Sequence, residues 1–77
     1  MSRITPLKPL KLIKILGKIG FKVVRQKGSH MILMNDKRVR IVVPVHPGKS
    51  VKPGLVRAII GEAGISREEF FKLLEEV

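Results

Sequence analysis

Cysteine, tyrosine and tryptophan are all missing from this chain of 77 residues, and acidic residues are scarce. Without cysteine there is no disulfide, no thiolate nucleophile and no cysteine-bound zinc. Two histidines and six carboxylates remain, and five of the carboxylates lie in the last sixteen residues. The sequence therefore argues against enzymes built on paired carboxylates or metal clusters, and we predict no metal site.

Long apolar runs are also missing. No stretch approaches the roughly 20 residues that a membrane span needs, and lysines interrupt the N-terminal region where a signal peptide would have its apolar core. The length allows one domain, predicted over residues 1–77, with little room for a deep cofactor cavity. An apolar fraction of 44% predicts a folded chain. We expect a cytoplasmic single domain without a cofactor.

Positive charge is what the chain has in excess, with sixteen Lys and Arg against six acids and a net charge of +10. The first sixty residues hold fourteen of the cations and one acid, Asp36, whereas residues 61–77 have more acids than bases. Such a balance predicts a polyanionic partner. We expect the basic part to face that partner and the acidic tail to face away from it.

A helix is predicted over residues 9–19. Its apolar side chains recur at helical spacing, and they are Leu12, Ile13, Leu16 and Ile19. Pro9 suits the first turn, where its missing N–H is not needed, and Gly20 suits the end of the helix. The opposite arc carries Lys8, Lys11, Lys14 and Lys18. These lysines are either a solvated face or a phosphate-binding stripe.

Three β-rich runs follow, at residues 21–26, 30–35 and 39–44. The connections between them are short enough for hairpin turns, so the runs predict an antiparallel meander. After a loop at 45–52, a helix is predicted from Pro53 to Gly64, and a capping box at Ser66 opens a last helix. The predicted fold is therefore α+β, in the order α-β-β-β-α with an added short C-terminal helix.

The middle run of the meander, Met31–Met34, is apolar on both faces of the predicted strand. Helices that cover one face would leave apolar side chains bare on the other. Either flexible Met and Lys stems cover that second face, or it is a partner surface. The sequence leaves both interpretations open.

Two patterns associated with RNA binding are weak in this chain. Gly17 and Gly20 have the spacing of the GxxG loop of KH domains, but they run directly into a strand, so helix termination explains them better. The only aromatic residues are Phe21, Phe70 and Phe71. Phe21 and Phe70 fall at core positions, which argues against a sheet on which bases stack.

The run Lys27-Gly28-Ser29-His30 is the strongest candidate site. Arg25 and Lys27 bring positive charge to a turn, Gly28 lets the backbone approach a ligand, and Ser29 offers a hydroxyl. His30 opens a strand, and imidazole suits proton transfer to or from a ribose 2′-OH near neutral pH. The neighbouring cations would hold the phosphate. The alternative is a histidine that merely pairs with backbone at a hairpin.

His46 lies in the predicted loop, with no carboxylate within nine residues. Two histidines are too few for a metal site. His46 is either a second acid–base group or an ordinary exposed loop histidine. Ser29 is the other candidate for a second proton-transfer group.

The ordered set of these residues resembles the HicA family of mRNA interferase toxins. The similarity rests on the first helix closing at Gly20-Phe21, the run Val23–His30, the segment Val43-Pro44-Val45-His46 and the second helix ending at Ala63-Gly64-Ile65. It covers about residues 9–71. Two departures are Leu55, where the family often has threonine after glycine, and the extra helix from Ser66.

The resemblance implies a fold like the double-stranded-RNA-binding domain and metal-independent cleavage of mRNA, with His30 as the catalytic histidine. It also implies a HicB-type antitoxin that covers this histidine, and no membrane or small-molecule cofactor. A non-catalytic double-stranded-RNA-binding module is the main alternative. A third possibility is a structural adaptor that docks through the two-sided apolar strand.

Overall fold

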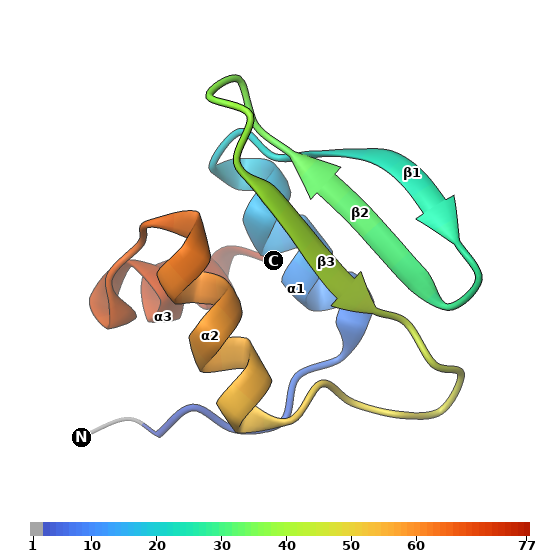
Figure 1. Cartoon of the computed structure of the whole chain (residues 1–77). Helices are drawn as coiled ribbons and strands as arrows, with labels where there is room; N and C mark the ends of the chain where they lie inside the picture. The colour runs from blue at the N-terminus through green and yellow to red at the C-terminus, as the bar shows by residue number, and fades with distance from the viewer. Residues whose placement is uncertain (1–2) are drawn as a thin grey trace.

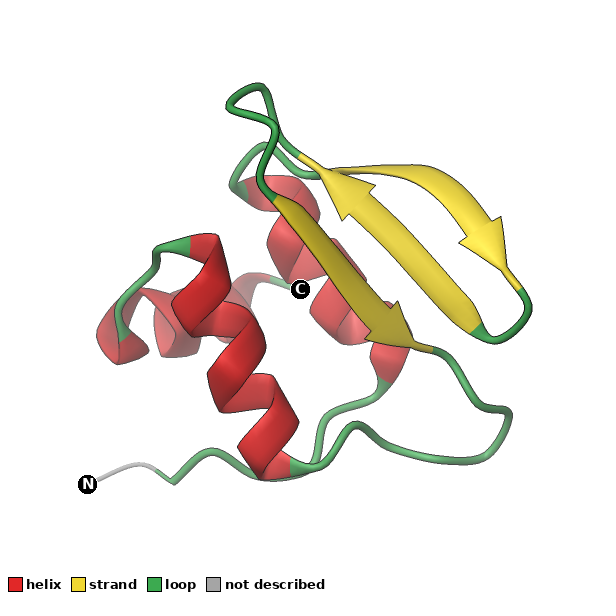
Figure 2. Cartoon of the chain, in the orientation of Figure 1, coloured by secondary structure: helices red, strands yellow, loops and turns green. Residues whose placement is uncertain are grey.

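A computed structural model describes residues 3–77 and shows three helices and three strands in the order α-β-β-β-α-α. The elements are α1 (Pro9–Lys18), β1 (Lys22–Lys27), β2 (His30–Met34), β3 (Arg40–Pro44), α2 (Pro53–Ala63) and α3 (Arg67–Glu76) (Figure 1). The strands form one antiparallel sheet in the order β1-β2-β3 (Figure 2). The predicted α+β order with its added C-terminal helix is confirmed, with strand ends shifted by one residue.

Helix α1 begins at Pro9 and leaves the helical path at Gly20, whose φ of +98° favours glycine. Its buried residues are Leu12, Ile15 and Leu16. Ile15 was not among the apolar residues predicted for this face, and Ile13 and Ile19 are only partly buried against the core. The core stripe is therefore centred between Leu12 and Leu16, and the four lysines of the opposite arc are all exposed.

The sheet has a core face and an open face. Leu33, Ile41 and Val43 point into the same hydrophobic cluster as the buried residues of the three helices. Ile32 belongs to the open face and lies outside that cluster, yet it is only 7% exposed. Its cross-strand neighbours are Arg25 in β1 and Val42 in β3. Val42 on the same face remains 43% exposed.

The segment before α1 is docked against the body of the protein. Leu7 and Val51 form an isolated antiparallel bridge, in which the Leu7 N–H donates to the Val51 carbonyl at 3.0 Å and the Val51 N–H donates back at 2.7 Å. Ile4, Leu7 and Val51 are all buried. The segment that precedes the first predicted helix thus contributes core side chains; Met1 and Ser2 lie outside the described residues.

Both C-terminal helices have the predicted ends. Gly64 closes α2 in the left-handed conformation at φ +77°. Ser66 and Glu69 form the predicted capping box, each side chain accepting a hydrogen bond from the other residue's N–H. Phe70 then anchors α3 in the core, at 2% exposure. Within residues 3–77, no helix has the length and apolar character that crossing a membrane would require.

Candidate functional site

The β1–β2 hairpin turns through two residues, Gly28 and Ser29, since Lys27 and His30 are directly paired across the strands. Gly28 has a φ of +58°, a conformation that side chains other than glycine's disfavour. A Cβ built on Gly28 would meet no atom within 4 Å, so the turn geometry itself accounts for the glycine. The sharp turn fixes Lys27 and His30 beside each other at the end of the sheet.

Register places three of the predicted site residues on the open face. His30 and Lys27 are cross-strand partners, and Arg25 pairs with Ile32, two residues along β2 from His30. Side chains alternate between faces along a strand, so these residues share one face, and a direct pair has Cβ atoms about 5 Å apart. Arg25, Lys27 and His30 are all exposed. The predicted cluster of Arg25, Lys27 and His30 is therefore assembled on one surface.

His46 is held by the backbone on both sides. Just before it, the Val45 N–H donates to the Ser29 carbonyl at 2.6 Å, and just after it, the His46 carbonyl accepts from the Lys49 N–H at 3.1 Å. The second bond closes a turn with Pro47 at its second position and Gly48, at φ +73°, at its third, which is the residue pattern of a type II turn. The segment predicted as a loop therefore holds His46 in a defined place.

The two histidines of the chain lie together. The ring centroids of His30 and His46 are 6.4 Å apart, and the rings are inclined at 75°. His30 pairs with Pro44, and the bond from Val45 to Ser29 continues this pairing one step beyond β3. Because side chains alternate between the two faces of an extended chain, His46 lies two residues after Pro44 on the same face as His30. Both imidazoles are exposed and accessible to a ligand.

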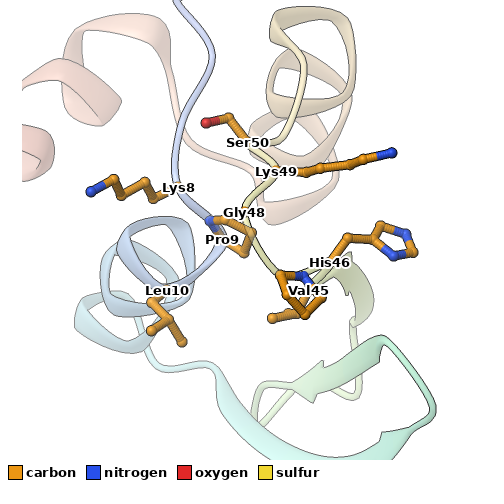
Figure 3. Close-up of a pocket in the computed structure, with 9 residues that line it drawn as sticks. Lys8, Pro9, Leu10, Val45, His46, Gly48, Lys49 and Ser50 are labelled. Carbon is orange, nitrogen blue, oxygen red and sulfur yellow. The ribbon is translucent and has the colours of Figure 1, made fainter.

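A hollow of about 340 Å³ lies between the start of α1 and the segment after β3. It is lined by Lys8, Pro9, Leu10, Val45, His46, Pro47, Gly48, Lys49 and Ser50. The side chains of His46 and Lys49 extend toward the same side of this segment (Figure 3). The hollow brings the beginning of α1 next to the histidine pair.

The lysine stripe on α1 divides into two parts. Lys8 and Leu10 also line a second hollow, of about 280 Å³, together with Lys11, Lys14 and Val77. The basic surface thus continues from His46 along the first turns of α1. Lys18 is different, because its ammonium lies 3.6 Å from a carboxylate oxygen of Glu76 on α3. Lys18 therefore serves the contact between two helices.

The described residues offer no metal centre. No group of three or more His, Asp or Glu side chains in residues 3–77 is placed to hold a metal ion. The chemistry available at the hairpin is that of two imidazoles surrounded by cations.

Two features of this arrangement were not predicted from the sequence. Lys49 was not predicted as a site residue, although the structure places it beside His46. The proximity of His46 to His30 was also missed. The pair Pro47-Gly48 predicts a tight turn directly after His46, but it does not indicate which residue lies next to His46 in space.

Comparison with known proteins identifies the family of the chain. The model of the family described as the HicA toxin of bacterial toxin–antitoxin systems matches residues 11–65. Comparison with curated proteins gives no match. The matched segment begins in the first turn of α1, takes in the whole sheet with both histidines and α2, and leaves out α3. Because the match covers most of the chain, this protein belongs to the HicA toxin family and is a toxin of the toxin–antitoxin type.

Proposed function

We propose that this toxin is a metal-independent endoribonuclease that cleaves mRNA in the cytoplasm, with His30 as its catalytic residue. The observation that carries the proposal is an exposed imidazole paired across the strands with Lys27, in a chain of the HicA family. RNA contains its own nucleophile, the ribose 2′-OH, so a proton-transfer group and cations that hold the phosphate suffice for cleavage.

His30 is suited to this role by its position. It opens β2 directly after a two-residue turn, so its backbone belongs to the sheet. Exposure lets a long RNA strand reach it without entering a deep pocket. In our proposal, His30 either removes the proton of the 2′-OH or delivers a proton to the leaving 5′ oxygen.

The cations around His30 would bind the phosphates. Lys27 and Arg25 share its face, and the backbone of Gly28 and Ser29 lies at the turn beside it. Lys11 and Lys14 extend the basic surface along α1. Lys18 is the weakest member of this predicted set, because Glu76 lies next to its ammonium.

The proposed protein partner is a HicB-type antitoxin. A toxin whose histidine is exposed on a basic face can be inhibited by any partner that covers that face. Adding the antitoxin in equal amount should abolish RNA cleavage. Undiminished cleavage in the saturated complex would contradict the masking proposal.

The central experiment compares the wild-type protein with the His30→Ala variant on an RNA substrate in excess EDTA. We expect wild-type cleavage to persist in EDTA and the variant to lose at least about 100-fold in rate, the lower bound for loss of a general acid or base. RNA binding by the variant should be preserved, since the phosphate contacts are made by other residues. Wild-type rates in the His30→Ala protein would refute His30 as the catalytic residue.

A second candidate function, the non-catalytic binding of duplex RNA, is favoured by the α-β-β-β-α order of the fold. It predicts salt-sensitive binding to duplex RNA without cleavage, and no arrest of growth when the protein is expressed. Salt dependence alone does not separate the two functions, because both use phosphate contacts. The appearance of cleavage products does.

A further inference from the structure

We infer that His46 is the second catalytic residue, and that His30 and His46 act as a general acid–base pair on either side of one phosphodiester. This inference rests on the proposed ribonuclease function and adds to it a second reacting group. It is carried by the placement of the two rings, which the sequence left undecided.

Cleavage through the 2′-OH requires two proton movements. One proton leaves O2′ as this oxygen forms a bond to phosphorus, and another reaches O5′ as the P–O5′ bond breaks. The attacking and leaving oxygens lie on opposite sides of the phosphorus. Two separate groups are therefore better placed than one to serve both oxygens in a single step.

His46 is the group that the fold supplies for the second proton. The ring centroids lie 6.4 Å apart on one exposed face, so both imidazoles can reach the same phosphodiester. The five carboxylates after residue 61 belong to the last turns of α2 and to α3, and Asp36 lies in the turn at the other end of the β2–β3 hairpin. The hairpin site thus has imidazoles as its proton-transfer groups.

The placement of His46 is specified by the fold. The 2.6 Å bond from Val45 to Ser29 ties the residue before His46 to the residue before His30. The turn closed by the Lys49 N–H holds the other side. Two exposed side chains are thereby held near each other by backbone bonds, without a direct bond between them, and a ligand can enter between them.

The neighbouring cations fit the same step. Lys27 lies across the strands from His30, and the side chain of Lys49 extends on the side of His46 (Figure 3). His30 therefore has Lys27 across the sheet, and His46 has Lys49 close to it along the chain. These ammonium groups would stabilise the charge that develops on the phosphate oxygens in the transition state.

The balanced reaction begins with one imidazole neutral and the other protonated. The neutral ring takes the proton of the 2′-OH, O2′ bonds to phosphorus, the P–O5′ bond breaks, and the protonated ring gives its proton to O5′. The products are a 2′,3′-cyclic phosphate and a 5′-hydroxyl. The two rings end with exchanged protonation states, and exchange with water restores them.

A substrate with an altered leaving atom tests this pair. In RNA whose scissile 5′ oxygen is replaced by sulfur, the thiolate leaves without needing a proton. We expect His46→Ala and His30→Ala each to slow cleavage of ordinary RNA by at least about 100-fold at saturating protein. On the sulfur-bridged RNA, one of the two variants should recover to within about tenfold of the wild type, and that variant identifies the acid.

Three controls complete the experiment. His46→Gln, which keeps a polar side chain of similar length, should be as slow as His46→Ala, and the circular dichroism of both should match the wild type. Lys49→Ala should weaken RNA binding with a smaller effect on the saturated rate. Products should end in a 2′,3′-cyclic phosphate.

The possible failures are distinguishable. If the wild type does not cleave either RNA, the proposed function is wrong and the pair fails with it. If the wild type cleaves but His46→Ala and His46→Gln cleave ordinary RNA within twofold of it, the inference about His46 is overturned while His30 stands. A slow His46→Ala protein with no recovery of either variant on sulfur-bridged RNA would make His46 a positioning residue and would also overturn the pair.

Discussion

The open face of the sheet and the C-terminal helix are both rich in charged residues, but they use these residues differently. Arg25 and Lys27 stand exposed on the open face, beside an exposed histidine. In α3, Glu69 is part of a capping box and Glu76 lies beside Lys18 of α1. These two acids of α3 thus contribute to the fold itself, whereas Arg25 and Lys27 of the sheet remain accessible to a partner.

The two regions also differ in how they meet the core. Helix α3 contributes Phe70 to the hydrophobic cluster, while the open face lies on the far side of the sheet from that cluster. The family match ends at residue 65, before α3 begins. We therefore expect substitutions in α3 to change stability and substitutions on the open face to change RNA binding and cleavage.

The largest expected effect on stability is that of Phe70→Ala. Phe70 is 2% exposed, and removing a buried phenylalanine costs about 3–5 kcal/mol, which is a large part of the about 5–15 kcal/mol that stabilises a typical domain. Urea unfolding followed by circular dichroism measures the loss. The exposed Glu68→Ala change in the same helix is the control, with an expected change of about 0.5 kcal/mol or less. A loss below about 1 kcal/mol for Phe70→Ala would show that α3 is dispensable for the core.

The next prediction concerns the open face. In the His30→Ala background, which keeps the RNA intact, replacing Arg25 and Lys27 by alanine should weaken single-stranded RNA binding. It should also reduce the slope of log affinity against log salt by about 1.4, or about 0.7 for each phosphate that the protein no longer neutralises. Fluorescence anisotropy over a salt series gives this slope.

A matched control lies at the opposite end of the sheet. Lys37 is in the β2–β3 turn, so Lys37→Ala removes one positive charge without touching the hairpin site. The salt slope should stay close to that of the parent protein. Equal effects of Lys37→Ala and Lys27→Ala would mean that net charge, and not the open face, determines RNA binding.

A smaller effect is expected from the cap of α3. The Ser66 hydroxyl accepts from the Glu69 N–H at 3.1 Å, and loss of such a cap costs about 1 kcal/mol. Ser66→Ala should therefore lower the free energy of unfolding by that amount without altering RNA cleavage. Ser50→Ala in the loop before α2 provides a serine control. A cleavage defect that exceeds the loss of folded protein would contradict the division between the two regions.

The smallest effect is expected at the contact between α1 and α3. The side chains of Lys18 and Glu76 are 41% and 48% exposed, so water screens their attraction. Glu76→Gln should change stability by no more than about 0.5 kcal/mol, and the change should vanish at high salt. Thermal unfolding at two salt concentrations measures it. A loss above about 2 kcal/mol would require Glu76 to have a further role in the fold.

Local chemistry made most of the fold predictable. Pro9 and Gly20 bound α1, Gly64 closes α2, and Ser66 with Glu69 opens α3, because each of these residues satisfies a backbone requirement at its own position. The two hairpin turns follow from the short connections between β-rich runs. These features depend on residues a few positions apart, which sequence patterns reveal directly.

Features that depend on distant residues were less accessible. The bridge between Leu7 and Val51 was not predicted, because the sequence around each residue does not indicate which distant residue it pairs with. Ile32 on the open face is likewise buried in the middle strand, which β1 and β3 flank on its two sides. Ile15 was missed because helical periodicity gives the width of an apolar stripe but not its centre when neighbouring positions are also apolar.

The sequence by itself determined the partition of charge along the chain, the absence of thiol chemistry and the choice of His30 beside Lys27 as the candidate site. Tertiary structure alone decided that His46 lies 6.4 Å from His30. Fifteen residues lie between the two along the chain, and no local pattern relates them. The antiparallel register of β2 and β3, continued by the bond from Val45 to Ser29, brings them together, since pairing between strands converts distance in sequence into contact in space.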